Sequence, residues 1–121
     1  TYFPKILSRN TSFYMLGWTP DSYDAQNAIF ALLMTPAANG QGLFNLGSYS
    51  NKRVDELGKA IASELDQTKR NAMIAELFKI HGEEFGTLPL HQQALAWAAK
   101  KSIQLVQLAD NTNQLKWTIV K

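Results

Sequence analysis

Hydrophobic residues recur through the middle of the chain at the three- and four-residue spacing of one helical face, and this spacing predicts three helices. We expect the first helix to begin at an N-cap formed by Asp21 or Ser22 and to end before Pro36, which breaks a helix. Its apolar stripe consists of Ala25, Ala28, Ile29, Leu32 and Leu33.

The next two stripes lie close together in the sequence and predict a helical hairpin. The second helix should span residues 52–64, with Ser50 or Asn51 as its N-cap. Asp66 should cap the third helix, which extends to about Phe85, and Gly86 follows where a left-handed stop is expected. The apolar stripes are Val54, Leu57, Ile61 and Leu65 in the second helix, and Met73, Ile74, Leu77, Phe78, His81 and Phe85 in the third.

Shorter apolar runs on either side of the helices are typical of strands. We expect strands at residues 12–18, 94–98, 102–108 and 115–120, and the last of these alternates between two faces. Between the first two helices, residues 37–50 contain three glycines around a few apolar residues. This composition predicts a long loop that is used in function or packed against another part of the molecule.

The composition is that of one ordered domain. The 121 residues are 45% hydrophobic and 18% charged, and no apolar run approaches the roughly 18 residues of a membrane span. A net charge of +2 is too small to indicate a nucleic-acid partner, and the absence of cysteine excludes disulfides and thiolate metal sites. Because the chain begins at Thr1 within ordinary domain sequence, we expect it to be a piece of a longer protein.

Motifs for catalysis or cofactor binding are weak. Residues 40–42 (GQG) lack the remaining residues of a phosphate-binding loop or a dinucleotide fingerprint, so we expect no cofactor. His81 and Glu84 lie three residues apart on the third helix, and with His91 they are the raw material of an acid–base pair or a metal site. His81 belongs to the apolar stripe, however, which favours a structural histidine. We therefore expect neither a metal site nor an enzyme.

Asp21 and Trp18 allow two interpretations. In the first, Asp21 is a helix N-cap and Trp18 belongs to the core, and the spacing alone favours this interpretation. In the second, the two residues bind a ligand. An ionised carboxylate in a partly desolvated cleft forms charge-assisted hydrogen bonds to an ammonium group, and an indole offers a flat apolar surface to a side chain. The second interpretation suits a ligand with a free amine.

Several short motifs follow one another along the chain. They are GWTPDSYD at residues 17–24, YSN at 49–51, VDEL at 54–57, Asp66 with Lys69-Arg70, and GTLPLH at 86–91. In this order and spacing the chain resembles the C-terminal part of family 5 extracytoplasmic solute-binding proteins, the dipeptide-, oligopeptide- and nickel-binding components of ABC importers. The resemblance extends from about Leu16 to Leu90 and continues more weakly to Lys121.

The resemblance implies an α/β fold and a role in transport. Family members are periplasmic proteins whose two lobes close on a peptide or another small solute and deliver it to a membrane permease. The chain would be a fragment of the C-terminal lobe of such a type II-like binding protein, with about three helices packed on a small mixed sheet. Residues 1–101 would belong to the second lobe, and residues 102–121 would return as strands to the first.

The resemblance also implies a ligand-binding role for four residues. In peptide-binding members, the position of Asp21 receives the amino terminus of the peptide. Gly17, Trp18 and Thr19 would run beside the peptide as strand-like partners, and Trp18 would also wall a side-chain pocket. The chain departs from the family pattern at Pro20, where a small residue is common, and after Asp24, where Ala25 replaces a proline. Because of these departures, the resemblance does not indicate which solute is bound.

The implied partners are a small solute, the permease subunits and the first lobe of the same protein, without nucleic acid. Two scattered histidines give a nickel role no support. In isolation, the apolar surface that faces the other lobe should promote self-association of the chain. The main alternative is a free-standing protein–protein interaction domain, which would dock a partner through its glycine-rich loop and its tryptophan-bearing strand. An enzyme that uses His81 and Glu84 is the third candidate.

Overall fold

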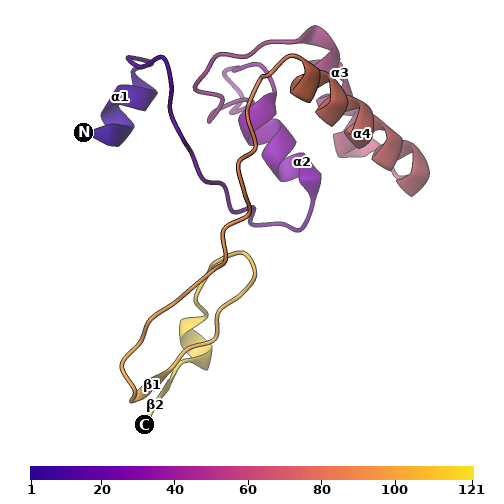
Figure 1. The fold of residues 1–121 in the computed structure, drawn as a ribbon. Coiled ribbons are helices and arrows are strands. Elements are labelled where there is room, and N and C mark those ends of the chain that lie inside the picture. Colours follow the sequence, from indigo (N-terminus) through magenta and orange to yellow (C-terminus); the bar gives the residue numbers. More distant parts are fainter. The chain divides into compact units, whose positions relative to one another are not determined.

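Helices occupy much of the chain as far as Glu83, and only short strands follow. The computed structural model describes residues 1–121, and it divides into two compact units. The helical unit comprises Thr1–Trp18 and Asp24–Leu88, and the C-terminal unit comprises Thr19–Tyr23 and Pro89–Lys121. The elements labelled in Figure 1 are α1 (Tyr2–Leu7), α2 (Ala25–Ala28), α3 (Lys52–Ser63), α4 (Gln67–Glu83), β1 (Ile103–Gln104) and β2 (Ile119–Val120). Two further elements are the π-helical segment η1 (Ile29–Leu33), which continues α2, and the 3-10 turn η2 (Leu115–Trp117).

The first predicted helix forms, but it begins later than expected. Asp24 is its N-cap, because the Oδ1 atom of Asp24 accepts a hydrogen bond of 2.7 Å from the amide of Gln26. The prediction of Asp21 or Ser22 as the cap was therefore wrong. A cap must lie two or three residues before the amide that it binds, and the bend at residues 21–24 places only the last of these carboxylates there.

The second half of this helix is widened into a π-helix by the glycine-rich loop. The amide of Met34 donates to the carbonyl of Ile29, five residues back, at 3.1 Å. The carbonyl of Phe30, which an α-helix would pair with Met34, accepts from the amide of Gly42 in the loop at 2.8 Å. Gly42 has a φ of +62°, and a Cβ atom there would lie 2.3 Å from the Met34 carbonyl oxygen. Only glycine fits this contact.

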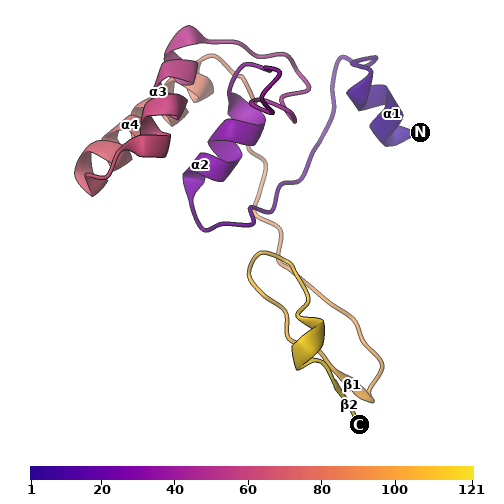
Figure 2. The same cartoon turned by 180° about the vertical axis from the view of Figure 1, so that it is seen from behind.

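α3 and α4 form the predicted hairpin and lie side by side in both views (Figures 1 and 2). Asn51 caps α3, and Asp66 caps α4, each by accepting hydrogen bonds of 2.8–3.2 Å from the amides two and three residues on. The stop after α4 was predicted wrongly. Phe85 (φ +54°), and not Gly86, adopts the left-handed conformation, because α4 ends at Glu83.

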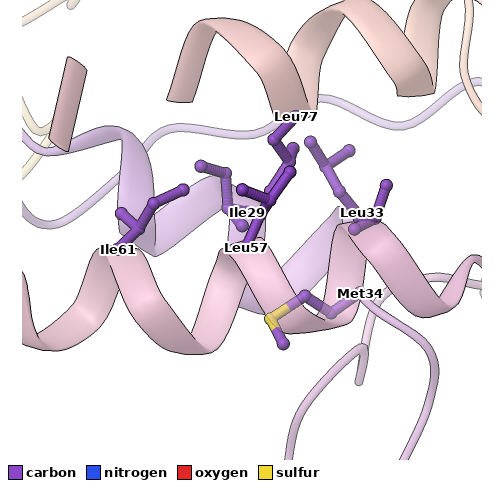
Figure 3. Packing of buried hydrophobic residues seen from close by; sticks show 7 residues of the cluster. Ile29, Leu33, Met34, Leu57, Ile61 and Leu77 are labelled. Carbon is purple, nitrogen blue, oxygen red and sulfur yellow. The ribbon is translucent and has the colours of Figure 1, made fainter. Parts of the chain in front are cut away.

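The apolar faces of α2, η1, α3 and α4 meet in the core of the helical unit (Figure 3). This arrangement confirms most of the predicted stripes as core-facing. Leu65, Phe78 and Phe85 are exceptions, since all three are exposed, and Leu65 lies beyond the end of α3. The buried cluster consists of Ile29, Leu33, Met34, Val54, Leu57, Ile61 and Leu77.

Arg70 joins the three helical segments through polar contacts. Its Nη2 atom lies 2.7 Å from Oδ1 of Asp24, the cap of α2, and its Nε atom donates to the carbonyl of Ile61 in α3 at 3.0 Å. The Arg70 side chain is only 17% exposed. Its hydrogen bond lowers the pKa of Asp24, with a further contribution from the amide of Gln26. The ion pair is therefore stronger above the ordinary carboxylate pKa and is lost as the pH falls through the lowered value.

The strands are much shorter than predicted. β1 and β2 form one antiparallel pair, with Ile103 opposite Val120. The predicted strands 102–108 and 115–120 thus retain two residues each, and η2 occupies part of the second. Residues 12–18 and 94–98 form no strand, because no second segment pairs with them. The sheet of this chain is two-stranded and antiparallel, not the small mixed sheet that the resemblance implies, while the binding-protein fold itself stays a prediction.

We expect the substitution Leu77→Ala to destabilise the helical unit by about 2–5 kcal/mol, since Leu77 is fully buried and its removal leaves a cavity. Leu65→Ala is the matched control, because the same change at a side chain that is 96% exposed should alter stability by less than about 0.5 kcal/mol. Urea denaturation followed by circular dichroism measures both. Equal effects of the two substitutions would contradict the assigned core.

Candidate functional site

Trp18 is held in place from two elements of the helical unit. Its indole Nε1 donates a hydrogen bond of 2.9 Å to Oδ1 of Asn27 in α2. The indole ring also packs on Phe44 of the glycine-rich loop, with ring centroids 5.1 Å apart and an interplanar angle of 55°. Trp18 is half-buried as a result. The indole is thus held by Asn27 and Phe44, and Trp18 stays partly exposed.

The other three predicted ligand-binding residues are exposed. A Cβ atom at Gly17 would meet nothing within 4 Å, so the backbone is open there. Thr19 and Asp21 belong to the C-terminal unit, and both side chains are solvent-accessible. The interpretation of Asp21 as a helix N-cap is wrong, because Asp24 performs that role.

The backbone of residues 17–19 forms no hydrogen bond within the chain. Unpaired donors and acceptors in an exposed segment are the groups that a bound extended peptide uses when it adds as a strand. The structure therefore leaves the backbone of Gly17, Trp18 and Thr19 available for such pairing, although the segment itself contains no strand.

A second polar cluster surrounds the carboxylate of Glu84 at the end of α4. The hydroxyl of Tyr49 donates to Oε2 of Glu84 at 2.6 Å, and Nδ2 of Asn51 donates to both carboxylate oxygens at 2.8 and 2.9 Å. These hydrogen bonds lower the pKa of Glu84. Burial and the neighbouring carboxylate raise the pKa of Tyr49, so its phenol stays neutral. The cluster joins the loop before α3 to the C-terminus of α4.

His81 lies beside this cluster and is only 4% exposed. Its ring meets the ring of Tyr49 edge-on at 4.6 Å, and Nε2 lies 3.0 Å from the hydroxyl of Thr87. Nδ1 has no hydrogen-bond partner, and burial lowers the pKa of the imidazole. The backbone of Gly86 closes over the ring: a Cβ atom there would lie 2.3 Å from Cε1 of His81. Gly86 thus provides close approach, not the left-handed stop that the sequence suggested.

The structure does not arrange His81, Glu84 and His91 as one site. Both oxygens of the Glu84 carboxylate accept from Tyr49 or Asn51, and no hydrogen bond joins it to His81. His91 is exposed in the C-terminal unit. No group of three or more histidine, aspartate or glutamate side chains is placed to hold a metal ion.

A hollow of about 230 Å³ opens at the surface of the helical unit. Phe30, Met34 and Ala62 supply apolar walls, while Gln26 and Lys59 are among the polar residues around it. None of the four residues predicted to bind ligand lines this hollow. It is therefore separate from the site that the sequence indicates.

Sequence reasoning missed the residues that support Trp18 and His81. Asn27 is a polar residue on a short helix, and Phe44 lies 26 positions beyond Trp18 in a loop, so neither carries a local signal. Thr87 and Tyr49 lie within recognised motifs, but nothing in their spacing indicated that they would meet His81.

Comparisons with protein-family models, with curated proteins and with solved structures found no match. No helix in the structure combines the length and apolar character of a membrane span.

We expect Tyr49→Phe to raise the pKa of Glu84 towards its ordinary value of 4.5, because the substitution removes the largest hydrogen bond that stabilises the carboxylate. The measurement is the titration of the Glu84 side-chain carboxyl by ¹³C NMR. Tyr23→Phe is the matched control, since that ring is 86% exposed and should leave the titration unchanged. A titration that is identical in wild type and Tyr49→Phe would show that the bond does not act on Glu84.

Proposed function

We propose that the chain is the C-terminal part of a family 5 extracytoplasmic solute-binding protein of an ABC importer, and that it contributes to capture of a peptide. The observation that carries the proposal is the ordered series of motifs from residues 17–24 to residues 86–91. The ligand would be enclosed between this part and the first lobe and delivered to a permease. Binding favours the closed form because the ligand contacts both lobes only there.

In this proposal Asp21 accepts the ammonium group of the peptide. The residue is exposed and carries a carboxylate within a motif that resembles the family's amine-binding position. A hydrogen bond between an ammonium and a carboxylate is stronger than one between neutral groups, and it strengthens further when a closing lobe excludes water. The requirement is a ligand with a free amino terminus.

Trp18 acts as a wall for a side chain of the ligand. Its contacts with Asn27 and Phe44 hold the indole before ligand binds, so little rotamer freedom is lost on association. The unpaired backbone of residues 17–19 supports the same proposal, because main-chain hydrogen bonds are independent of the peptide's sequence. The role requires no covalent chemistry and no cofactor.

Exposed apolar side chains of the C-terminal unit also support the fragment interpretation. In the proposed longer protein, these side chains would be covered by the remainder of the chain. They are Leu90, Leu95, Trp97, Leu115, Trp117, Ile119 and Val120.

In the longer protein, Asp21→Asn should weaken binding of a peptide with a free amino terminus by about 10- to 150-fold, the range for loss of a hydrogen bond to a charged group. Isothermal titration calorimetry measures the affinity. Glu56→Gln, which removes an exposed charge from α3, should leave the affinity unchanged. An N-acetylated peptide should bind weakly to wild type and variant alike. Equal affinity of wild type and Asp21→Asn for the free peptide would remove the ammonium role.

The isolated chain should self-associate, because its exposed apolar surface has no covering lobe. Static light scattering over a dilution series should give an average molecular mass that decreases as the protein is diluted. A free-standing interaction domain would instead remain monomeric until its partner is added. A strict monomer at every concentration would therefore count against the fragment proposal and favour that alternative.

A further inference from the structure

The C-terminal end of α4 is closed by a set of side chains and backbone groups around His81. We call this set the clasp and define it as Tyr49, His81, Glu84, Gly86 and Thr87. His81 is enclosed by the Tyr49 ring, the Gly86 backbone and the Thr87 hydroxyl. Tyr49 precedes α3 in the sequence, whereas Gly86 and Thr87 follow α4. All five residues belong to the helical unit, and Thr87 lies one residue before the last residue of that unit, Leu88.

The closed clasp favours a neutral imidazole over a protonated one. One ring nitrogen, Nε2, has the Thr87 hydroxyl as a partner, and the other, Nδ1, has none. In a protonated imidazole both nitrogens carry hydrogens and must donate. The second donor would be buried without an acceptor beside the backbone of Gly86, and such a group costs free energy.

The charged groups around His81 do not remove this cost. The Glu84 carboxylate is the acidic neighbour, and its attraction for a charged imidazole opposes the effect of burial. Its oxygens accept hydrogen bonds from Tyr49 and Asn51, however, and none of them is bonded to Nδ1, which has no partner. Tyr49 itself is neutral, and the carboxylates of Glu84 and Asp55 both act to keep it so.

We propose that protonation of His81 opens the clasp, so that residues 84–88 detach from Tyr49 and the end of α4 under mildly acidic conditions. The clasp is then an acid-sensitive latch at the point where the chain leaves the helical unit. This inference rests on the packing of His81 and is independent of the proposed transport function.

The direction of the pH effect follows from linkage. Burial places the pKa of His81 in the closed clasp below its ordinary value of 6.5, which applies in the open state. Above that value both states are unprotonated and the clasp has its full stability. As the pH falls below 6.5, the open state gains a proton that the closed state resists, so the open population grows. At pH 5.0 the growth is limited to about thirtyfold for one proton.

Amide hydrogen exchange measures the opening at defined positions. The amides of Phe85 and Gly86 donate to the carbonyls of Gly82 and His81 at 3.2 and 3.1 Å, so both should be protected in the closed clasp. Between about pH 7.5 and about pH 5.0, we expect their protection factors, corrected for intrinsic exchange, to fall severalfold and by no more than about thirtyfold. The amide of Gly42, which donates to the carbonyl of Phe30, is the control and should keep its protection factor, because neither residue belongs to the clasp. Unchanged protection of Phe85 and Gly86 in wild type would overturn the proposal.

Two variants assign the effect to His81. His81→Gln cannot titrate and retains an amide that can bond to Thr87, so its Phe85 and Gly86 amides should show no pH dependence over the same range. His91→Gln removes the exposed histidine and should behave like wild type. Retention of the acid response in His81→Gln, or its loss in His91→Gln, would refute the assignment. If His81→Gln does not fold, the ¹H–¹³C NMR titration of the His81 ring in wild type decides: a titration at or above pH 6.5 would overturn the proposal.

Discussion

The ion pair between Arg70 and Asp24 is the contact on which the arrangement of the helical unit depends. α2 has only four residues and cannot be stable alone, because helix nucleation costs more than so few hydrogen bonds return. Asp24 both caps α2 and binds Arg70, while Arg70 also binds the Ile61 carbonyl. One guanidinium group thus fixes the start of α2 against α3 and α4. Asn27, which lies on α2 and holds the indole of Trp18, takes its position from the same contact.

The helical hairpin could be predicted because its signals are local. Asn51 and Asp66 lie directly before apolar stripes of the correct period, and both proved to be caps. The N-cap of the first helix lies two or three residues beyond its predicted place, because Asp21, Ser22 and Asp24 are all residue types that favour an N-cap. What distinguishes them is Arg70, 46 positions beyond Asp24. The π-helical winding depends in the same way on a remote donor, Gly42 in the loop.

The predictions of strands were largely wrong for a related reason. Alternating apolar residues show that a segment can pair, but the partner comes from elsewhere in the chain. Residues 12–18 and 94–98 have no partner in these 121 residues. The candidate site shows the same contrast between local sequence signals and contacts with remote residues. Trp18 and Asp21 are predicted from their local motif, whereas the partners of Trp18 and the enclosure of His81 arise from tertiary contacts.

The polar contacts of the helical unit respond to acid in a defined order. The proton that opens the clasp is bound by an imidazole, whose ordinary pKa of 6.5 sets the pH at which loss of stability begins. The hydrogen bonds to Glu84 and Asp24 lower the pKa of each carboxyl from ordinary values of 4.5 and 3.8, so these contacts weaken only below those values. The apolar core carries no titrating carboxylate and is not directly affected. Mild acid should therefore act on the clasp while the Arg70–Asp24 pair still holds α2, and with it Trp18, in place. The acid-sensitive end of α4 and the indole that faces the proposed ligand are thus separable, because different charges support them.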